Sequence, residues 1–291
     1  MTASETNAIA VIGGGTMGVG IAYVAALAGM PVAVVEPDAG RAEVMRRTID
    51  EAVTSAIGRG KLDQVGGDAL AGRITCVAAV EDLAEGLSLI VESVPERLDL
   101  KLDVLARCAA RRPRLLASNT SALSIDRLAQ AVSDPSTFFG MHFFNPVWSI
   151  KLVELVRGAA TSEATLVQAR AFVTALGKDS LTVHDVPGFA TSRLDLIASL
   201  EAMRMLESGV ASAEDIDRAA VLAYRHPVGP LRLSDIVGLD VRLDIARTLE
   251  AAHGERFAPP QILIDMVAAG KLGAKSGHGF FAWPDPSRKE A

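Results

Sequence analysis

The sequence predicts an α/β protein in which a doubly wound, mostly parallel sheet is followed by an all-helical C-terminal domain. In the first half of the chain, short runs of β-branched residues alternate with longer segments of helical periodicity, as in a parallel sheet with crossover helices. Strand patterns stop after the turn signal at residues 185–188. Beyond it, apolar residues such as Leu194, Ile197 and Leu200 recur at helical spacing. We therefore expect two domains, at residues 1–185 and 186–291.

The candidate strands of the first domain are apolar runs closed by Gly, Pro, Asp or Ser. A sheet of about six to eight strands is expected, a common size for doubly wound sheets. The runs lie at residues 8–12, 31–36, 74–77, 89–92, 114–118, 138–143, 150–156 and 180–183. In the second domain, Met203 and Met205 are expected to pack in the helical core.

The composition, with 49% hydrophobic and 22% charged residues, is that of an ordinary globular protein and argues against a disordered or collagen-like chain. The formal net charge of −6 provides no basic field for a polyanion, so we expect no nucleic-acid partner. The N-terminus is polar, and the chain has no apolar stretch of about eighteen residues, the minimum for a membrane-spanning helix. Neither a signal peptide nor a membrane segment is expected.

Cysteine usage indicates a reducing compartment. Cys76 and Cys108 have neither CxxC nor metal-ligand spacing. We therefore expect no disulfide framework, no metal site and a cytoplasmic location.

A glycine-rich turn follows the first candidate strand and opens a helical segment. Within AVIGGGTMGVGIA, Gly13, Gly15 and Gly18 stand in G-x-G-x-x-G register. Such glycines allow a tight turn, a close backbone approach to pyrophosphate and close packing of helix on strand, while the amides of the helix N-terminus favour phosphate. In this context the motif predicts a Rossmann-type NAD-binding domain. The predicted phosphate-binding residues are Gly13, Gly14, Gly15, Thr16, Met17 and Gly18.

Glu36 ends the second candidate strand. An acidic side chain at this place accepts hydrogen bonds from ribose hydroxyls and repels a 2′-phosphate, which favours NAD over NADP. The alternative is an ordinary surface glutamate before Pro37. The surrounding strand–helix–strand pattern favours the cofactor role.

His142 is the histidine whose position most needs an explanation. It stands near the end of a hydrophobic run in GMHFFNP, and ligands in open α/β sheets bind at the carboxyl ends of strands. Glu154 lies on the next run, KLVELV. If the two strands are neighbours, the carboxylate can orient the imidazole as a general base for oxidation of a secondary alcohol, with hydride passing to a nicotinamide. The alternative is a packing histidine and a solvated glutamate, and spacing alone does not decide between them.

The segment SNTSALSI, at residues 118–125, follows another strand run and offers small hydroxyl and amide groups. These groups can belong to the site, or they can cap the helix that follows, since Ser and Asn are leading capping residues. The residues alone leave both interpretations open.

Taken together, the motifs resemble the 3-hydroxyacyl-CoA dehydrogenase family, in its short-chain 3-hydroxybutyryl-CoA branch. The resemblance covers nearly the whole chain, and the order of the motifs makes it specific. It rests on GGGTMG at residue 13, VESVPERLDLK at 91, SNTSALSI at 118, GMHFFNPVWSIKLVELV at 140, VPGFATSRL at 186, HPVGPLRLSDIVGLD at 226 and KLGAKSGHGFF at 271.

The resemblance implies roles for the residues at matching positions. His142 is similar to the family's catalytic base and Glu154 to the carboxylate that orients it. Ser121 resembles the serine that hydrogen-bonds the substrate oxygen near the nicotinamide. Asn145 resembles a cofactor-contacting asparagine at the same centre.

Further contacts are implied around this centre. Glu96 and Lys101 resemble contacts to the nicotinamide-side ribose, and Lys275 resembles another NAD-contacting lysine. A helical hairpin after the second strand meets CoA in the family, which makes Arg59 and Lys61 candidate phosphate contacts. The alternative for these two is a solvated helix end, where basic residues complement the dipole.

Two positions depart from the family's pattern. Ser192 stands where the family usually has an active-site asparagine. A serine hydroxyl reaches less far than an asparagine amide, which carries a donor and an acceptor on separate atoms. Trp148 stands where the family tends to have proline, so a bulky ring is expected to reshape the acyl pocket.

The sequence therefore predicts an NAD-dependent L-3-hydroxyacyl thioester dehydrogenase, with a short-chain acyl-CoA substrate and a homodimeric assembly implied by the resemblance. One alternative is a dehydrogenase of the same scaffold that acts on a free hydroxy acid, such as carnitine or a sugar acid, or on an acyl-carrier-protein thioester. Another is a dinucleotide-binding relative without turnover.

Overall fold

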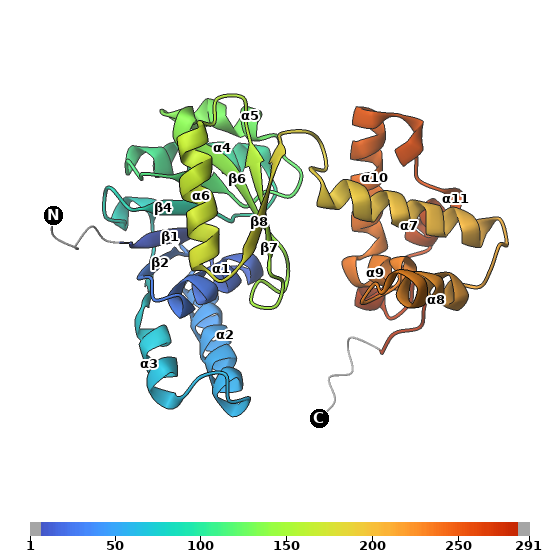
Figure 1. The fold of residues 1–291 in the computed structure, drawn as a ribbon, viewed down its shortest axis with the longest axis horizontal. Helices are drawn as coiled ribbons and strands as arrows, with labels where there is room; N and C mark the ends of the chain where they lie inside the picture. The colour runs from blue at the N-terminus through green and yellow to red at the C-terminus, as the bar shows by residue number, and fades with distance from the viewer. Residues whose placement is uncertain (1–6, 285–291) are drawn as a thin grey trace. The chain divides into compact units, whose positions relative to one another are not determined.

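The computed structural model describes residues 7–284. The chain divides into two compact units, Met1–Val186 and Pro187–Ala291, each with its own hydrophobic core (Figure 1). The strands are β1 (Ile9–Ile12), β2 (Val32–Val35), β3 (Ile74–Val77), β4 (Leu89–Glu92), β5 (Leu116–Ser118), β6 (Phe138–Phe143), β7 (Leu152–Arg157) and β8 (Asp179–His184). The helices of the first unit are α1 (Thr16–Leu27), α2 (Ala39–Gly58), α3 (Gln64–Gly72), α4 (Leu98–Ala110), α5 (Ile125–Leu128) and α6 (Glu163–Ala175).

Within residues 7–284, the first unit holds an eight-stranded sheet with strand order β3-β2-β1-β4-β5-β6-β7-β8. Neighbouring strands are parallel except β6 and β7, which are antiparallel. This order reverses direction between β1 and β4, the topological switch point at which doubly wound sheets bind ligands. The predicted Rossmann-type fold is confirmed.

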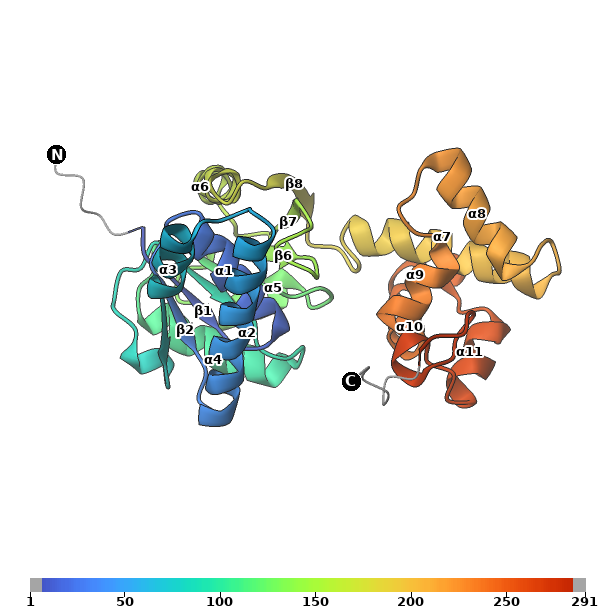
Figure 2. The same ribbon diagram turned by 90° about the horizontal axis from the view of Figure 1, so that it is seen from below.

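Helices cover both faces of this sheet, which explains why its central strands are continuous apolar runs (Figure 2). Side chains of α1, α2 and α6 share one core cluster with the strands. Helix α4 packs beside β4 on the opposite face (Figure 2). The sheet therefore exposes its strand ends rather than its faces, and polar side chains that follow the strands are available for a site.

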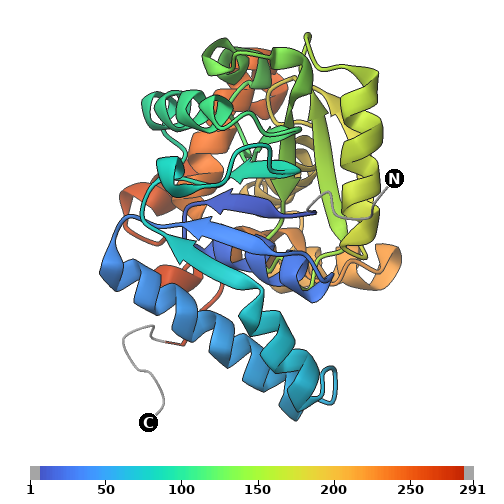
Figure 3. The ribbon, with the colours of Figure 1, turned by 90° about the vertical axis from the view of Figure 1, so that its left-hand side faces the viewer.

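Helices α2 and α3 form a hairpin that projects from the sheet (Figure 3). Asp38 and Asp63 cap their N-termini, accepting from Arg41 N and Gly66 N at 2.7 Å each. Gly67 lets the two helices approach closely, since a Cβ there would lie 2.8 Å from the Ile57 side chain.

The second unit is helical, as predicted, with α7 (Thr191–Glu207), α8 (Ala213–Tyr224), α9 (Pro230–Val237), α10 (Leu239–His253) and α11 (Gln261–Ala268). Leu200, Met203 and Leu243 lie in its core, and Met205 packs against it. Buried Asp235 accepts from Phe280 N, Phe281 N and Trp283 Nε1, and so holds the segment after α11 on the helices.

No helix between residues 7 and 284 is both long and apolar enough to cross a membrane.

Candidate active site

A cavity of about 630 Å³ lies at the carboxyl ends of β1, β2, β4 and β5. Its volume is within the range of small-molecule sites. The predicted glycine-loop residues and the segments that follow β2, β4 and β5 form its wall, including Gly13, Gly15, Thr16, Met17, Glu36, Ser93, Glu96, Asn119 and Ser121.

The glycine loop is built for close approach. Gly13 has a positive φ of 108°, and a Cβ there would lie 2.8 Å from the Ser93 carbonyl oxygen. A Cβ on Gly18 would stand 1.9 Å from the Gly13 carbonyl oxygen, so only glycine fits at this position in the first turn of α1. At Gly15, the N-cap residue of α1, no heavy atom lies within 4 Å of a Cβ position. The loop therefore leaves open backbone at a helix N-terminus, which suits a pyrophosphate.

Glu36 stands directly after β2 with only 6% of its surface exposed. Its carboxylate accepts from Gly14 N and Asp38 N at 3.1 Å each and pairs with Arg41 Nε at 3.2 Å. These contacts fix an acidic group in the cavity wall beside the glycine loop, where a ribose hydroxyl can reach it. Loop and carboxylate together fit an NAD molecule.

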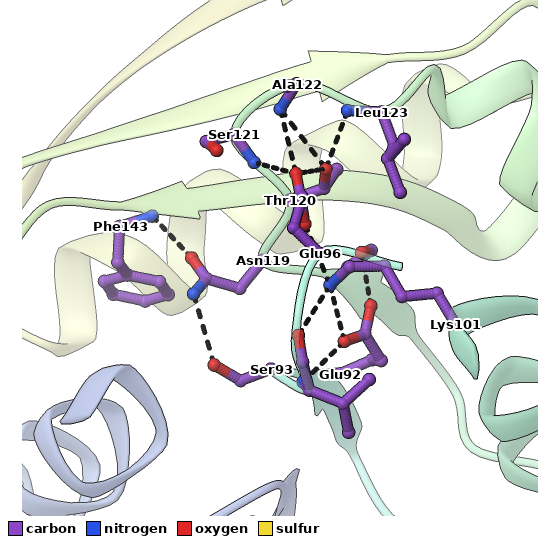
Figure 4. Close-up of polar contacts among 12 residues, drawn as sticks. Glu92, Ser93, Glu96, Lys101, Asn119, Thr120, Ser121, Ala122, Leu123 and Phe143 are labelled. Atoms are coloured by element: carbon purple, nitrogen blue, oxygen red, sulfur yellow. Dashed lines mark hydrogen bonds and ion pairs between the residues drawn. The ribbon is translucent and has the colours of Figure 1, made fainter. Parts of the chain in front are cut away.

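A buried ion pair supports the loop after β4 (Figure 4). Lys101 Nζ lies 2.7 Å from Glu92 Oε1, 3.1 Å from the Val94 carbonyl oxygen and 3.3 Å from Glu96 Oε2. The Lys101 side chain is 1% exposed and that of Glu92 is fully buried. Burial raises the pKa of Glu92, and the Lys101 charge opposes that shift. Lys101 was expected to contact a cofactor ribose; the structure instead places its ammonium beneath the loop, where it supports Glu96.

Glu96 in turn organises the turn after β5 (Figure 4). Its Oε1 accepts from Thr120 Oγ1 at 2.5 Å, Ser121 N at 3.0 Å and Ala122 N at 3.1 Å. Burial works to raise the pKa of Glu96, but Lys101 and these hydrogen bonds hold it below its usual value. Both interpretations of the SNTSALSI segment have structural support, because Ser124 caps α5 while Asn119 and Ser121 line the cavity.

His142 and Glu154 face each other on the antiparallel pair β6 and β7. His142 Nδ1 lies 2.8 Å from Glu154 Oε2. The imidazole is almost buried and the carboxylate fully so, which makes the contact short and shielded from solvent. The Phe144 ring packs on the imidazole at a centroid distance of 4.4 Å. The dyad expected from the sequence is therefore assembled.

The segment after β6 carries Asn145 and Trp148, both exposed. Lys178 anchors it, with Nζ donating to the carbonyl oxygens of Val147 at 2.5 Å and Ile150 at 2.6 Å. Burial lowers the pKa of Lys178. The Trp148 ring meets Tyr23 edge-on at a centroid distance of 6.0 Å.

The two candidate phosphate contacts lie between α2 and α3. Arg59 is the C-cap residue of α2 and donates from Nη2 to Ser55 Oγ at 2.5 Å, while Lys61 is exposed. Burial raises the pKa of Tyr23, and the Arg59 charge acts against that shift.

Two predicted residues belong to the second unit, so the geometry of the first unit does not place them in this site. Ser192 is half-buried in the first turn of α7. Lys275 Nζ contacts the Asp240 carboxylate at 2.5 and 2.6 Å.

Family models match both units. The 3-hydroxyacyl-CoA dehydrogenase NAD-binding domain matches residues 8–186, and the C-terminal domain of the same family matches residues 188–283. The chain belongs to the 3-hydroxyacyl-CoA dehydrogenase family. It is accordingly an NAD-dependent oxidoreductase, and the predicted family, enzyme class and cofactor are confirmed.

Relatives within this family are similar over nearly their full length. A 3-hydroxybutyryl-CoA dehydrogenase of Mycobacterium tuberculosis is 39% identical over 280 residues, covering 94% of this chain and 98% of the relative. One from Bradyrhizobium diazoefficiens is 37% identical, covering 98% of this chain and 100% of the relative. The crystal structure of (S)-3-hydroxybutyryl-CoA dehydrogenase from Ralstonia eutropha has a TM-score of 0.92 at 34% identity, covering 97% of this chain and 100% of that one.

Sequence reasoning missed the residues that hold this dehydrogenase site together. Glu92, Asn119 and Lys178 carry buried or half-buried polar contacts, yet none was predicted. A charged residue closing an apolar run was the available signal for Glu92. Asn119 stood inside a recognised motif, but its partner Phe143 is 24 positions away, and no local pattern reveals such a pairing.

Proposed function

We propose that the protein oxidises a short-chain L-3-hydroxyacyl-CoA to the 3-oxoacyl thioester, with His142 as general base and Glu154 as the carboxylate that orients it. The observation that carries this proposal is the 2.8 Å contact between His142 Nδ1 and Glu154 Oε2 at the carboxyl end of β6. The same strand end is joined to the cavity wall through Asn119.

The dyad suits proton removal from a hydroxyl group. When Nδ1–H donates to Glu154, the imidazole is held in the tautomer whose Nε2 accepts a proton. The buried carboxylate then stabilises the imidazolium that forms. The low exposure of both groups strengthens this stabilisation, because charges interact more strongly away from water.

The cavity residues divide the binding of NAD among them. Amides of the loop from Gly13 to Gly18 would hold the pyrophosphate, and Glu36 would accept from the hydroxyls of the adenosine ribose. Glu96 would lie at the second ribose, held there by Lys101. Asn145 would lie on the nicotinamide side. When bound, NAD supplies the acceptor for the hydride that leaves the substrate carbon.

The substrate would lie between the dyad and the α2–α3 hairpin. Ser121, exposed in the turn held by Glu96, would donate to the substrate oxygen. Trp148 would border the acyl or pantetheine portion, and Arg59 and Lys61 would pair with phosphates of CoA. A CoA thioester is further supported by the relatives named 3-hydroxybutyryl-CoA dehydrogenase.

A substrate panel tests this proposal. We expect NADH formation, followed by absorbance, with (S)-3-hydroxybutyryl-CoA and little with its (R) isomer, with longer chains, or with free 3-hydroxybutyrate. Turnover that favours carnitine, a sugar acid or an acyl-carrier-protein thioester would overturn the substrate assignment. Tight NADH binding without turnover of any of them would instead indicate a non-catalytic relative.

We also propose a homodimer built on the second unit. Large apolar side chains that are more than half exposed support this proposal, because buried interfaces cover such groups; they are Leu194, Leu222, Tyr224 and Ile236. Sedimentation at micromolar concentration should give twice the chain mass, and a monomer would contradict this assembly.

A cytoplasmic location is proposed because Cys76 and Cys108 are both free thiols and CoA thioesters are intracellular metabolites.

A further inference from the structure

Strand β6, which carries His142, extends beyond its neighbour β5. Leu116, Ala117 and Ser118 of β5 pair with residues 138–140, and the register ends there. Residues 141–143 continue β6, paired on the other side with β7. On the β5 side, the part of the strand that holds the imidazole therefore lies past the end of the parallel ladder.

The Asn119 side chain takes the place of the missing ladder. Asn119 directly follows β5, and its Oδ1 accepts from Phe143 N at 2.9 Å. Its Nδ2 donates to Ser93 Oγ at 3.2 Å, in the segment after β4 (Figure 4). One amide side chain thus joins the ends of three neighbouring strands. Asparagine suits this task because its short arm carries both an acceptor and a donor.

Asn119 is itself firmly held. Its backbone N–H donates to the Glu92 carbonyl oxygen at 2.7 Å, and the next residue, Thr120, donates to Glu96. Glu92 and Glu96 are both tied to the buried Lys101 ammonium. The end of β6 is therefore connected, through Asn119, to the same ion-pair network that positions Ser121.

The fold does not depend on this contact. Phe143 is 2% exposed and pairs with Val153 in β7, so its position in the core is set independently of Asn119. Losing the amide would release the β5 side of the strand end, while the pairing with β7 remains. A shift of this strand end is costly for catalysis, since misplacement of a reacting group by about 1 Å can reduce the rate about 100-fold.

We propose that Asn119 is a positioning residue that fixes His142 relative to Ser121 and the cofactor cavity. This assignment rests on the proposed function, in which His142 is the base. Asn119 acts through the strand end and the Ser93 segment. Because it also borders the cofactor cavity, its loss should lower kcat much more than it changes KM for NAD.

The test compares two near-isosteric variants. Asn119→Leu keeps the volume and removes both hydrogen bonds, and we expect kcat to fall about 10- to 100-fold with KM for NAD within about threefold of wild type. Asn119→Asp keeps an acceptor for Phe143 N–H and can accept from Ser93 Oγ–H, so it should recover most of the lost kcat. A role in packing alone would give the opposite order.

Controls separate the possible failures. Thr137→Ala removes a side-chain-to-backbone bond at the other end of β6, Thr137 Oγ1 to the Asp134 carbonyl oxygen, and should leave kcat unchanged. NADH binding, followed by fluorescence, establishes that each variant is folded. Wild-type kcat in Asn119→Leu, or a loss confined to KM for NAD, overturns the positioning role. Wild-type kcat in His142→Gln, measured in parallel, overturns the proposed function instead.

Discussion

His142 and Glu154 stand directly opposite each other on β6 and β7, with Nδ1 and Oε2 2.8 Å apart. The pairing exists because β7 is antiparallel to β6 and therefore returns the chain past the end of the strand that carries the imidazole. In an all-parallel sheet, the next strand would begin at the opposite edge and a crossover helix would intervene. The single reversal in this sheet thus creates the dyad.

Glu154→Gln tests the electrostatic half of the dyad. The amide preserves shape but no longer stabilises an imidazolium, so kcat should fall about 100-fold or more. Steady-state kinetics with saturating NAD measure this loss, and a kcat equal to that of wild type would count against the pairing.

Lys101→Met removes the cation from the buried network. The variant leaves Glu92 buried without its counter-charge, which should cost about 3–5 kcal/mol in the free energy of unfolding. The double variant Lys101→Met with Glu92→Gln should recover much of that loss. Urea unfolding monitored by circular dichroism gives the three values; equal stability of the single variant and wild type would be inconsistent with a stabilising pair.

The same variant predicts a pH dependence with a definite sign. Burial already raises the pKa of Glu92 above its usual value of 4.5, and loss of Lys101 raises it further. A group with a raised folded-state pKa stabilises the fold below about 4.5 and loses that contribution as the pH rises through the folded value. Unfolding curves from pH 5 to pH 8 should therefore show a steeper loss of stability for Lys101→Met than for wild type.

Glu36→Gln tests cofactor choice. Loss of the charge weakens the contact to ribose hydroxyls and removes repulsion of a 2′-phosphate. A hydrogen bond to a charged group contributes about 1.5–3 kcal/mol, so the preference of kcat/KM for NAD over NADP should fall at least about tenfold. Unchanged discrimination between the two cofactors would show that Glu36 is not the selecting group.

Trp148→Ala tests the substrate border. The ring is 46% exposed and contacts Tyr23 at its edge, so its removal should not unfold the protein. We expect KM for the acyl-CoA to rise about three- to tenfold with kcat changed little, the pattern of lost uniform binding. If free hydroxy acids became as good as thioesters, Trp148 would be a selectivity element rather than a simple contact.

Sequence periodicity was sufficient for the fold because the central strands are buried on both faces and read as apolar runs, such as Ile9–Ile12. The glycine loop was equally readable, since Gly13 and Gly18 are required by backbone contacts of less than 3 Å. The buried contacts that hold the site in place could not be predicted from the sequence. The resemblance implied that Lys101 contacts the nicotinamide-side ribose, and only the three-dimensional structure shows that its ammonium binds Glu92 and the Val94 carbonyl oxygen.

The most direct measurement is single-turnover oxidation of (S)-3-hydroxybutyryl-CoA by His142→Gln, with NADH binding measured on the same preparation. We expect loss of hydride transfer by a factor of about 100 or more, while the dissociation constant for NADH stays within about threefold of wild type. Hydride transfer at the wild-type rate would show that His142 does not accept the substrate's proton.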